Sequence, residues 1–280
     1  MRQYVACEAP DVAGMLRTPP GDFHYLYTVL RMRAGHTCAV RLPDGTLICM
    51  MVHEIDEKRK TLTFERCGTL TTRAAAQKAP PVDAPQNIAW WLFAFIARPQ
   101  KMELIIRQAV ECGVSCIVPV VGAYSQAGSV AAFTRGRSER IERIIREART
   151  QSGSPIATTV TEALPLSAAM TRWHEATADC PAEHIAAAVL YERQESAITI
   201  HQIAAAHPLL QKGAIAVGCE RGISPEECAV LQTHGFVPVH FAGNILRCET
   251  AALYGIAAFQ SAVLERTTWN LNESILSACQ

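Results

Sequence analysis

From about residue 87 to its end, the chain alternates between strand-like and helix-like segments, and this alternation constrains the fold more than any other feature. Residues 88–97 are apolar throughout, as expected for a strand that is covered on both faces. In the next segment Met102, Ile105, Ile106 and Ala109 recur at helical spacing. The pattern predicts an α/β domain with a mainly parallel sheet. Further strands are predicted at 115–121, 186–191, 214–218 and 236–241, and further helices at 138–151, after the capping box Ser224-Pro225-Glu226-Glu227, and at 249–264.

The N-terminal part of the chain has a different, β-rich texture. Apolar runs at 37–42 and 47–55 flank Pro43-Asp44-Gly45-Thr46, and Asp-Gly between such runs predicts a hairpin. A third strand is predicted at 61–67. Residues 68–86 then lose periodicity and collect threonine, alanine and proline. This stretch is typical of a linker or a domain boundary.

Composition excludes several classes of protein. Lys plus Arg (26) balances Asp plus Glu (26), so nucleic-acid binding requires a local patch of charge. The longest apolar run, 88–97, is too short for the ~20 residues of a membrane-spanning helix. No signal-peptide core follows the N-terminus, so we expect a soluble, cytoplasmic protein. Eleven cysteines without any C-x-x-C, and nine scattered histidines, favour reduced thiols and no metal site.

Two polar turns follow neighbouring predicted strands near the C-terminus. Gly218-Cys219-Glu220-Arg221-Gly222 comes after one buried strand, and Leu246-Arg247-Cys248-Glu249-Thr250 comes after the next. Glycines allow a ligand to approach the backbone, and open α/β sheets bind ligands at the carboxyl ends of their strands. The turns therefore predict one ligand crevice. Rossmann, P-loop and G-x-S-x-G motifs are absent from the sequence.

The residues of both turns, and other conspicuous residues, also have purely structural interpretations. The 218–222 turn is also compatible with an ordinary strand–helix loop, and Arg247 with Glu249 is also compatible with a surface pair. The arginine-rich helix at 138–151 has interleaved glutamates that offer i,i+4 partners, as on a solvated face. Trp90 and Trp91 are typical of a core.

Four segments resemble the family of 16S rRNA uridine-N3 methyltransferases (the RsmE family). Residues 98–104 and 108–114 are similar to its "K-M-E … E-L-G-V" segment, and 146–153 is similar to "R-E-A-x-E-Q-S-G". Residues 246–251 resemble "L-R-T-E-T-A", with Cys248 in place of threonine, and 29–35 matches "V-L-R-M-x-x-G". The resemblance covers nearly the whole chain in order.

The resemblance implies a fold and a reaction. Residues 1–70 are expected to form a PUA-like β-barrel that docks RNA, 71–86 a linker, and 87–280 a SPOUT α/β domain with a deep trefoil knot. The cofactor is expected to be S-adenosylmethionine, and the protein is expected to form a homodimer. The implied reaction methylates N3 of a uridine in 16S rRNA of the small ribosomal subunit. A catalytically altered RNA-binding paralogue, or a methyltransferase acting on another RNA such as tRNA, are the alternatives.

The resemblance also implies site residues, but it identifies no general base. Arg247 and Glu249 are expected at the reacting site, with Arg247 on RNA or on the cofactor carboxylate and Glu249 orienting it. Arg31, Arg33, Arg41, Arg143 and Arg146 are the candidate RNA-binding residues. The cofactor is expected to lie against Leu190, Val217, Gly218, Glu220, Gly222, Phe241, Ile245, Leu246, Thr250 and Ala251.

The glycine-rich turn departs from the family pattern. The family reads "G-P-E-G-G" where this chain has Cys219 in place of proline and Arg221 in place of glycine. An arginine there disfavours positive φ and brings a bulky side chain to the cofactor's turn. We predict that Arg221 points away from the adenine pocket, toward solvent or RNA phosphate; the alternative is that it blocks the pocket. Asn244 also stands where the family has an arginine.

Overall fold

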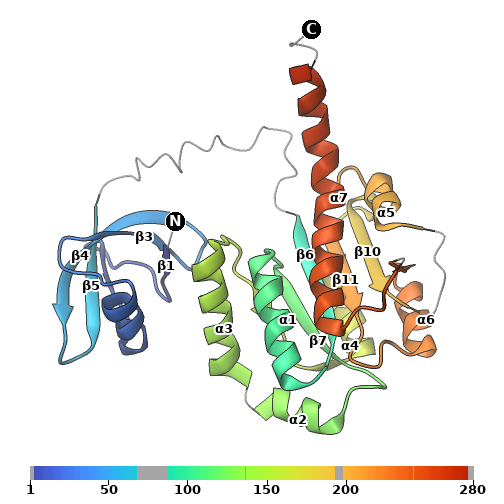
Figure 1. Cartoon of the computed structure of the whole chain (residues 1–280), viewed down its shortest axis with the longest axis horizontal. Coiled ribbons are helices and arrows are strands. Elements are labelled where there is room, and N and C mark those ends of the chain that lie inside the picture. The colour runs from blue at the N-terminus through green and yellow to red at the C-terminus, as the bar shows by residue number, and fades with distance from the viewer. Residues whose placement is uncertain (1–2, 68–87, 136, 193–197, 242, 277–280) are drawn as a thin grey trace. The chain divides into compact units, whose positions relative to one another are not determined.

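The structure, a computed structural model, describes residues 3–67, 88–135, 137–192, 198–241 and 243–276 (Figure 1). Its contacts divide the chain into two compact units. The N-terminal unit combines Met1–Ala79 with Arg149–Ala157, and the C-terminal unit combines Pro80–Ala148 with Thr158–Gln280. The grouping of Arg149–Ala157 with the first unit was not anticipated. The predicted linker, 71–86, lies outside the described residues, and the predicted domain boundaries stay a prediction.

The N-terminal unit contains a curled five-stranded sheet in the order β1-β3-β4-β5-β2. β1 and β3 are parallel, and the other neighbours are antiparallel. The sheet surrounds an apolar cluster that includes Leu26, Val40, Met50, Leu62 and Phe64, all fully buried. The elements are β1 (Gln3–Val5), β2 (Met15–Arg17), a 3-10 turn (Pro20–Asp22), a π-helical segment (His24–Val29), β3 (Thr37–Arg41), β4 (Leu47–Asp56) and β5 (Thr61–Arg66).

The predicted hairpin is confirmed between β3 and β4. The amide of Leu42 donates to the carbonyl of Thr46 at 2.8 Å, and the amide of Gly45 donates to the carbonyl of Leu42 at 3.0 Å. Gly45 has a φ of 88°, in the region where glycine is favoured. The third predicted strand is β5.

The C-terminal unit is built on a parallel sheet in the order β12-β10-β11-β6-β7-β8, with β9 also paired to β7. The predicted α/β class with a parallel sheet is therefore confirmed. Its strands are β6 (Ala89–Phe95), β7 (Cys116–Val121), β8 (Thr159–Val160), β9 (Leu164–Pro165), β10 (Ile185–Leu190), β11 (Lys212–Val217) and β12 (Phe236–Val239). Its helices are α1 (Pro99–Glu111), α2 (Ala127–Arg135), α3 (Arg137–Ser152), α4 (Leu166–Thr177), a 3-10 turn (Ala182–His184), α5 (Ile200–Ala206), α6 (Pro225–Thr233) and α7 (Cys248–Leu276).

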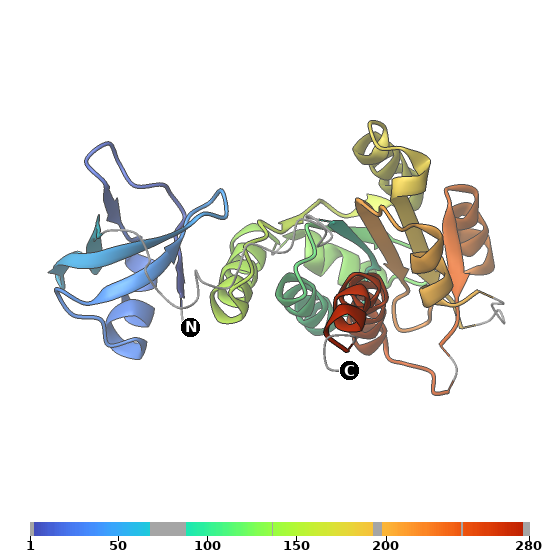
Figure 2. The same ribbon diagram turned by 90° about the horizontal axis from the view of Figure 1, so that it is seen from above.

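Successive aromatic residues of β6 point to opposite faces of the sheet and pack against different helices. Trp90 meets Phe259 of α7 edge-on, with ring centres 5.1 Å apart, whereas Trp91 meets Trp173 of α4 at 5.5 Å. Figure 2 shows α1 and α7 on one side of the sheet and α4 on the other. Helices on both faces explain why the central strands are apolar throughout. The interpretation of Trp90 and Trp91 as core residues is confirmed.

Helices α6 and α1 agree with the capping and spacing signals of the sequence. The side chain of Ser224 accepts from the amide of Glu227, and the Glu227 carboxylate accepts from the amide of Ser224 at 2.9 Å, so the predicted capping box starts α6. α1 buries Met102, Ile105, Ile106 and Ala109 as their spacing predicts. α2, α4 and α5 were not predicted, and α7 continues beyond residue 264. No helix in the described residues is long and apolar enough to cross a membrane.

Candidate functional site

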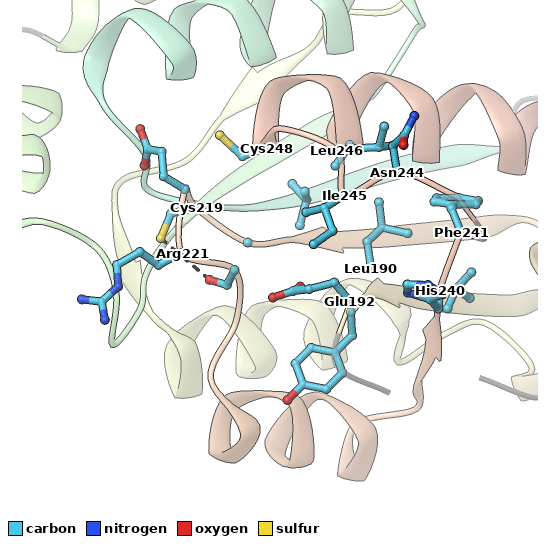
Figure 3. A pocket seen from close by; sticks show the side chains of 17 residues that line it. Leu190, Glu192, Cys219, Arg221, His240, Phe241, Asn244, Ile245, Leu246 and Cys248 are labelled. Carbon is cyan, nitrogen blue, oxygen red and sulfur yellow. Dashed lines mark hydrogen bonds between the residues drawn. The ribbon is translucent and has the colours of Figure 1, made fainter. Parts of the chain in front are cut away.

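A pocket of about 230 Å³ lies at the carboxyl ends of three adjacent strands, β12, β10 and β11 (Figure 3). Phe241 and 244–246, from the connection between β12 and α7, also line it. The parallel register brings the ends of β10 and β11 level, since Leu190 is paired with Val217. Every residue predicted to contact a cofactor except Thr250 lines this pocket: Leu190, Val217, Gly218, Glu220, Gly222, Phe241, Ile245, Leu246 and Ala251.

The 218–222 turn forms one wall, and its glycines are required by its geometry. Gly222 has a φ of 79°, and its amide donates to the carbonyl of Cys219 at 3.0 Å. A Cβ at Gly222 would lie 2.6 Å from the Glu192 carboxylate, and a Cβ at Gly218 would collide with the backbone of Gly222. Each glycine therefore allows an approach that a larger residue prevents.

Arg221 fits this turn without backbone strain. It is absent from the described non-glycine residues that have positive φ, which are Arg31 and Lys60. Arg221 is among the residues that line the pocket, but its side chain points away from the pocket interior, and its guanidinium carbon lies 4.9 Å from the centre of the Tyr124 ring (Figure 3). The left-handed residue of the turn is Gly222, which this chain retains.

The pocket wall is largely apolar. Leu190 and Val217 are buried at the ends of their strands, whereas Ile245 is 83% exposed in the loop that precedes α7. Phe241 packs edge-on against Tyr254 of α7, with ring centres 4.7 Å apart. Apolar walls with a few polar groups are typical of small-molecule sites.

A charged cluster lies beside the pocket and joins three elements. The ammonium nitrogen of Lys101, in the first turns of α1, is 3.2 Å from the Glu249 carboxylate and 3.9 Å from the Glu220 carboxylate. Glu220 also accepts from the backbone amide of Arg98 at 3.1 Å. The thiol of Cys248 donates to Glu249 at 3.2 Å. The cluster therefore connects α1, the 218–222 turn and the start of α7.

The cluster shifts the pKa values of its members. Burial raises the pKa of the Cys248 thiol to about 12, with the Glu249 carboxylate adding to the shift, so this thiol stays protonated at neutral pH. Burial disfavours the charged form of Glu249, but hydrogen bonds from its own amide, from Cys248 and from Lys101 outweigh burial and lower its pKa. Burial also opposes the charge of Lys101, but the Glu249 carboxylate and the other negative charges nearby raise its pKa.

The two predicted catalytic residues lie outside the pocket lining. Arg247 is exposed at the end of the loop that precedes α7, and Glu249 lies in the first turn of that helix. Glu249 is paired with Lys101, a partner that was not anticipated. Thr250 is exposed on the same helical turn, and in the structure it does not line the pocket. The roles predicted for these residues stay predictions.

The candidate RNA-binding arginines of the N-terminal unit differ in accessibility. Arg31 is exposed and has a φ of 53°. Arg33 lies over the Tyr27 ring at 4.4 Å, and it donates to the carbonyls of Tyr27 and Met32. Arg41 is half-buried and donates to the carbonyls of Gly45 at 2.7 Å and Gly153 at 3.1 Å, so its guanidinium is engaged by the backbone.

The remaining candidates lie on α3 in the C-terminal unit. Arg143 is exposed, and its Nε lies 3.9 Å from the Glu147 carboxylate at i,i+4 spacing. Arg146 is half-buried. This helix therefore carries both a solvated ion pair and accessible positive charge. The structure is compatible with a solvated surface and with an RNA-binding surface.

Several residues in or beside the pocket were not predicted: Glu192 and His240 in its lining, Lys101 in the charged cluster, and Tyr124 against Arg221. His240 directly follows β12, and Glu192 comes two residues after the end of β10, so the position after a strand was an available signal. Lys101 comes from the start of α1 and Tyr124 from the β7–α2 connection, and the fold alone brings them to the turn. Among the described residues, no group of three potential metal ligands is present.

The sequence around the pocket matches the model of a known protein family. Residues 84–260, more than half of the chain, match the model of the RNA methyltransferase domain. The chain therefore belongs to the RNA methyltransferase domain family. The matched residues include the whole parallel sheet and every residue of the pocket.

Individual relatives align with most of the length of the chain. The chain is 26% identical over 248 residues to ribosomal RNA small subunit methyltransferase E 2 of Borreliella burgdorferi, covering 87% of this chain and 89% of the relative. It is 27% identical over 256 residues to ribosomal RNA small subunit methyltransferase E of Mycobacterium bovis, covering 89% and 87%. Both alignments are longer than the 84–260 match to the family model, so they include part of the N-terminal unit.

Solved structures share the fold. The ribosomal RNA small subunit methyltransferase E of Neisseria gonorrhoeae, bound to S-adenosyl methionine, superposes with a TM-score of 0.74 at 21% identity, over 93% of this chain and 97% of that chain. A probable rRNA-methyltransferase from Porphyromonas gingivalis gives 0.67 at 22% identity, over 94% and 98%.

Proposed function

We propose that this protein methylates N3 of a uridine in 16S rRNA of the small ribosomal subunit, with S-adenosylmethionine as the methyl donor. The observation that carries the proposal is the glycine-framed pocket at the carboxyl ends of β10, β11 and β12, inside the region that matches RNA methyltransferases. The names of the relatives supply the substrate, since both act on small-subunit rRNA.

The residues of the pocket fit the proposed cofactor. Leu190, Val217 and Leu246 provide an apolar surface for an adenine ring. Gly218 and Gly222 keep the turn tight, so a ligand can approach its backbone. Glu192 and Glu220 are acidic residues of the pocket wall, and acidic groups suit a ligand whose reactive sulfur is a cation.

The chain's own contribution to the reaction is alignment and proton removal. The bound cofactor supplies a methyl group that is electrophilic because its sulfur is positively charged. The pocket residues would hold the cofactor at the carboxyl ends of β10, β11 and β12, and orienting two reactants lowers the barrier. Methylation at N3 releases the imide proton of the uridine, so an acceptor is required. Glu192, Glu220 and His240 line the pocket and are the candidate acceptors among the described residues.

The remaining parts of the proposal concern fold details and assembly. We propose that the curled N-terminal sheet is a PUA-like barrel that docks RNA and that the C-terminal unit contains a deep trefoil knot, an exception to the rarity of knots. A homodimer is proposed on the resemblance to the family. The proposed substrate is a component of the ribosome, so ribosome biogenesis in the cytoplasm is the proposed setting.

A modification map of cellular RNA tests the proposal. Mass spectrometry of 16S rRNA from cells with and without the gene is expected to show one N3-methyluridine that is lost on deletion and restored by the intact gene. Loss of a modification in tRNA instead would reassign the substrate. An unchanged map together with retained RNA binding would support a non-catalytic RNA-binding protein.

A further inference from the structure

Arg221 and Tyr124 form a contact at the rim of the pocket, between two loops that are far apart in the sequence. Tyr124 belongs to the connection between β7 and α2, and Arg221 belongs to the 218–222 turn. The guanidinium carbon lies 4.9 Å from the centre of the ring, within the range of a cation–π interaction. Figure 3 shows Arg221 pointing away from the pocket interior.

Glu227, at the start of α6, holds the loop of Tyr124 beside Ser224, which follows the 218–222 turn. One of its carboxylate oxygens accepts from the amide of Ala123 at 2.6 Å, next to Tyr124, and the other accepts from the amide of Ser224 at 2.9 Å. Ser125 adds a hydrogen bond to the amide of Gly122 at 3.2 Å. The backbone near Tyr124 is therefore held by hydrogen bonds before a ligand binds. Binding at the Arg221–Tyr124 pair then loses little conformational entropy.

The charge of Arg221 is available to a ligand. The neighbouring Glu220 is directed to Lys101 and to the amide of Arg98. Within the described part of the chain, the ion pairs do not include Arg221, and its side chain is exposed at the pocket rim. An exposed guanidinium on an aromatic ring can contact a phosphate with its N–H groups and a base with its plane.

We propose that Arg221 and Tyr124 bind a nucleotide of the RNA substrate next to the target uridine. This inference rests on the proposed function and adds a binding site to it. The reacting base has to reach the methyl group in the pocket, so the adjoining strand passes over the rim. At the rim, Arg221 contacts the phosphate, and its cation–π pair with Tyr124 supports a base. Arg221 stands where the family pattern that the sequence resembles has a glycine, so that pattern does not supply the guanidinium of this contact.

The test compares RNA affinity with cofactor affinity in the same full-length variants. Arg221→Gln removes the charge and keeps much of the length, and Tyr124→Leu removes the ring. The RNA probe is small ribosomal subunits from cells that lack the gene, and the cofactor probe is S-adenosylmethionine in calorimetry. Arg172→Gln, an exposed arginine of α4, is the matched control.

Arg221→Gln and Tyr124→Leu are each expected to weaken RNA binding by about tenfold and to leave cofactor affinity within about twofold, while the control changes neither. The double variant is expected to lose less than the product of the two single losses, since the residues act as a pair. Arg221→Gln is also expected to reduce the slope of log affinity against log salt by about 0.7–0.9, as one phosphate contact predicts.

Unchanged RNA affinity in Arg221→Gln would overturn the inference. A loss of cofactor affinity as large as the loss of RNA affinity would overturn it as well, because it would assign Arg221 to the cofactor wall. Failure of the wild-type protein to bind the cofactor would refute the proposed function itself, and this outcome is distinct from both.

Discussion

The ammonium of Lys101 lies 3.2 Å from the carboxylate of Glu249, which joins the start of α1 to the start of α7. Both side chains are largely buried, with exposed fractions of 27% and 14%. Because Lys101 also lies 3.9 Å from Glu220, one cation holds both connections that flank the pocket. The positions of the pocket loops therefore depend on a residue that does not line the pocket.

Replacing Lys101 by methionine tests this dependence. The variant leaves Glu220 and Glu249 without their shared cation, so we expect the free energy of unfolding to fall by about 1 kcal/mol, the upper end for partly exposed ion pairs. Cofactor affinity is expected to fall several-fold because Glu220 lies in the turn. Lys101→Arg keeps the cation and is expected to retain most of both quantities. Denaturant titration and calorimetry measure them, and a methionine variant equal to the wild type would refute the role.

The same pair predicts a pH dependence of stability. The pKa of Glu249 is lowered in the folded protein, so its contribution is present above the ordinary glutamate value and is lost as pH falls through the folded pKa. The pKa of Lys101 is raised, so its contribution is present below the ordinary lysine value and is lost as pH rises through the folded pKa. The stability difference between wild type and Lys101→Met is therefore expected to be constant from about pH 5 to pH 10 and to shrink on both sides. A difference that persists at pH 2 would contradict the ion pair as its source.

Gly222→Ala is expected to damage the pocket through the backbone. The φ of 79° costs a residue with a Cβ about 1–2 kcal/mol, and the new methyl group would approach the Glu192 carboxylate. We therefore expect the free energy of unfolding to fall by about 1–2 kcal/mol and the cofactor affinity to fall tenfold or more. Gly128→Ala is the control, because a Cβ there meets nothing within 4 Å and the site lies in helix α2. Thermal unfolding and calorimetry on both variants decide the point; equal behaviour would mean that the turn tolerates a side chain.

RNA binding is expected to depend on local charge although the net charge is zero. Arg31 and Arg143 are exposed members of the predicted set, one in each unit. Changing either to glutamine is expected to lower the slope of log affinity against log salt by about 0.7–0.9 per lost phosphate contact. Lys58→Gln, an exposed change of the same charge, serves as the control. If both arginine variants keep the wild-type slope, these residues are a solvated surface.

Much of the parallel sheet could be predicted because a strand is recognised from a short run of consecutive residues. Apolar runs mark β6, β7, β10 and β11, and the Ser224 capping box marks α6. Helix α4 was missed although Met170, Trp173 and Thr177 are buried at helical spacing. α5 was missed as well, although Thr199 and Gln202 form a capping box that the sequence displays.

The site was only partly predictable because some of its contacts are distant in sequence. The turn and the α7 loop were found because glycines and polar residues follow strands that end at the same edge. Lys101 is 147 residues from Cys248, and no local pattern connects them. The orientation of Arg221 could be predicted from the glycines around it, whereas its contact with Tyr124 depends on how β7 and β11 are placed in the sheet.

Calorimetric titration of the full-length protein with S-adenosylmethionine is the decisive measurement, because the proposed methyl transfer requires cofactor binding at the ends of β10, β11 and β12. One site per chain is expected, with the affinity reduced at least tenfold in Gly222→Ala and unchanged in Gly128→Ala. Absence of both heat and thermal stabilisation at millimolar cofactor would contradict the account.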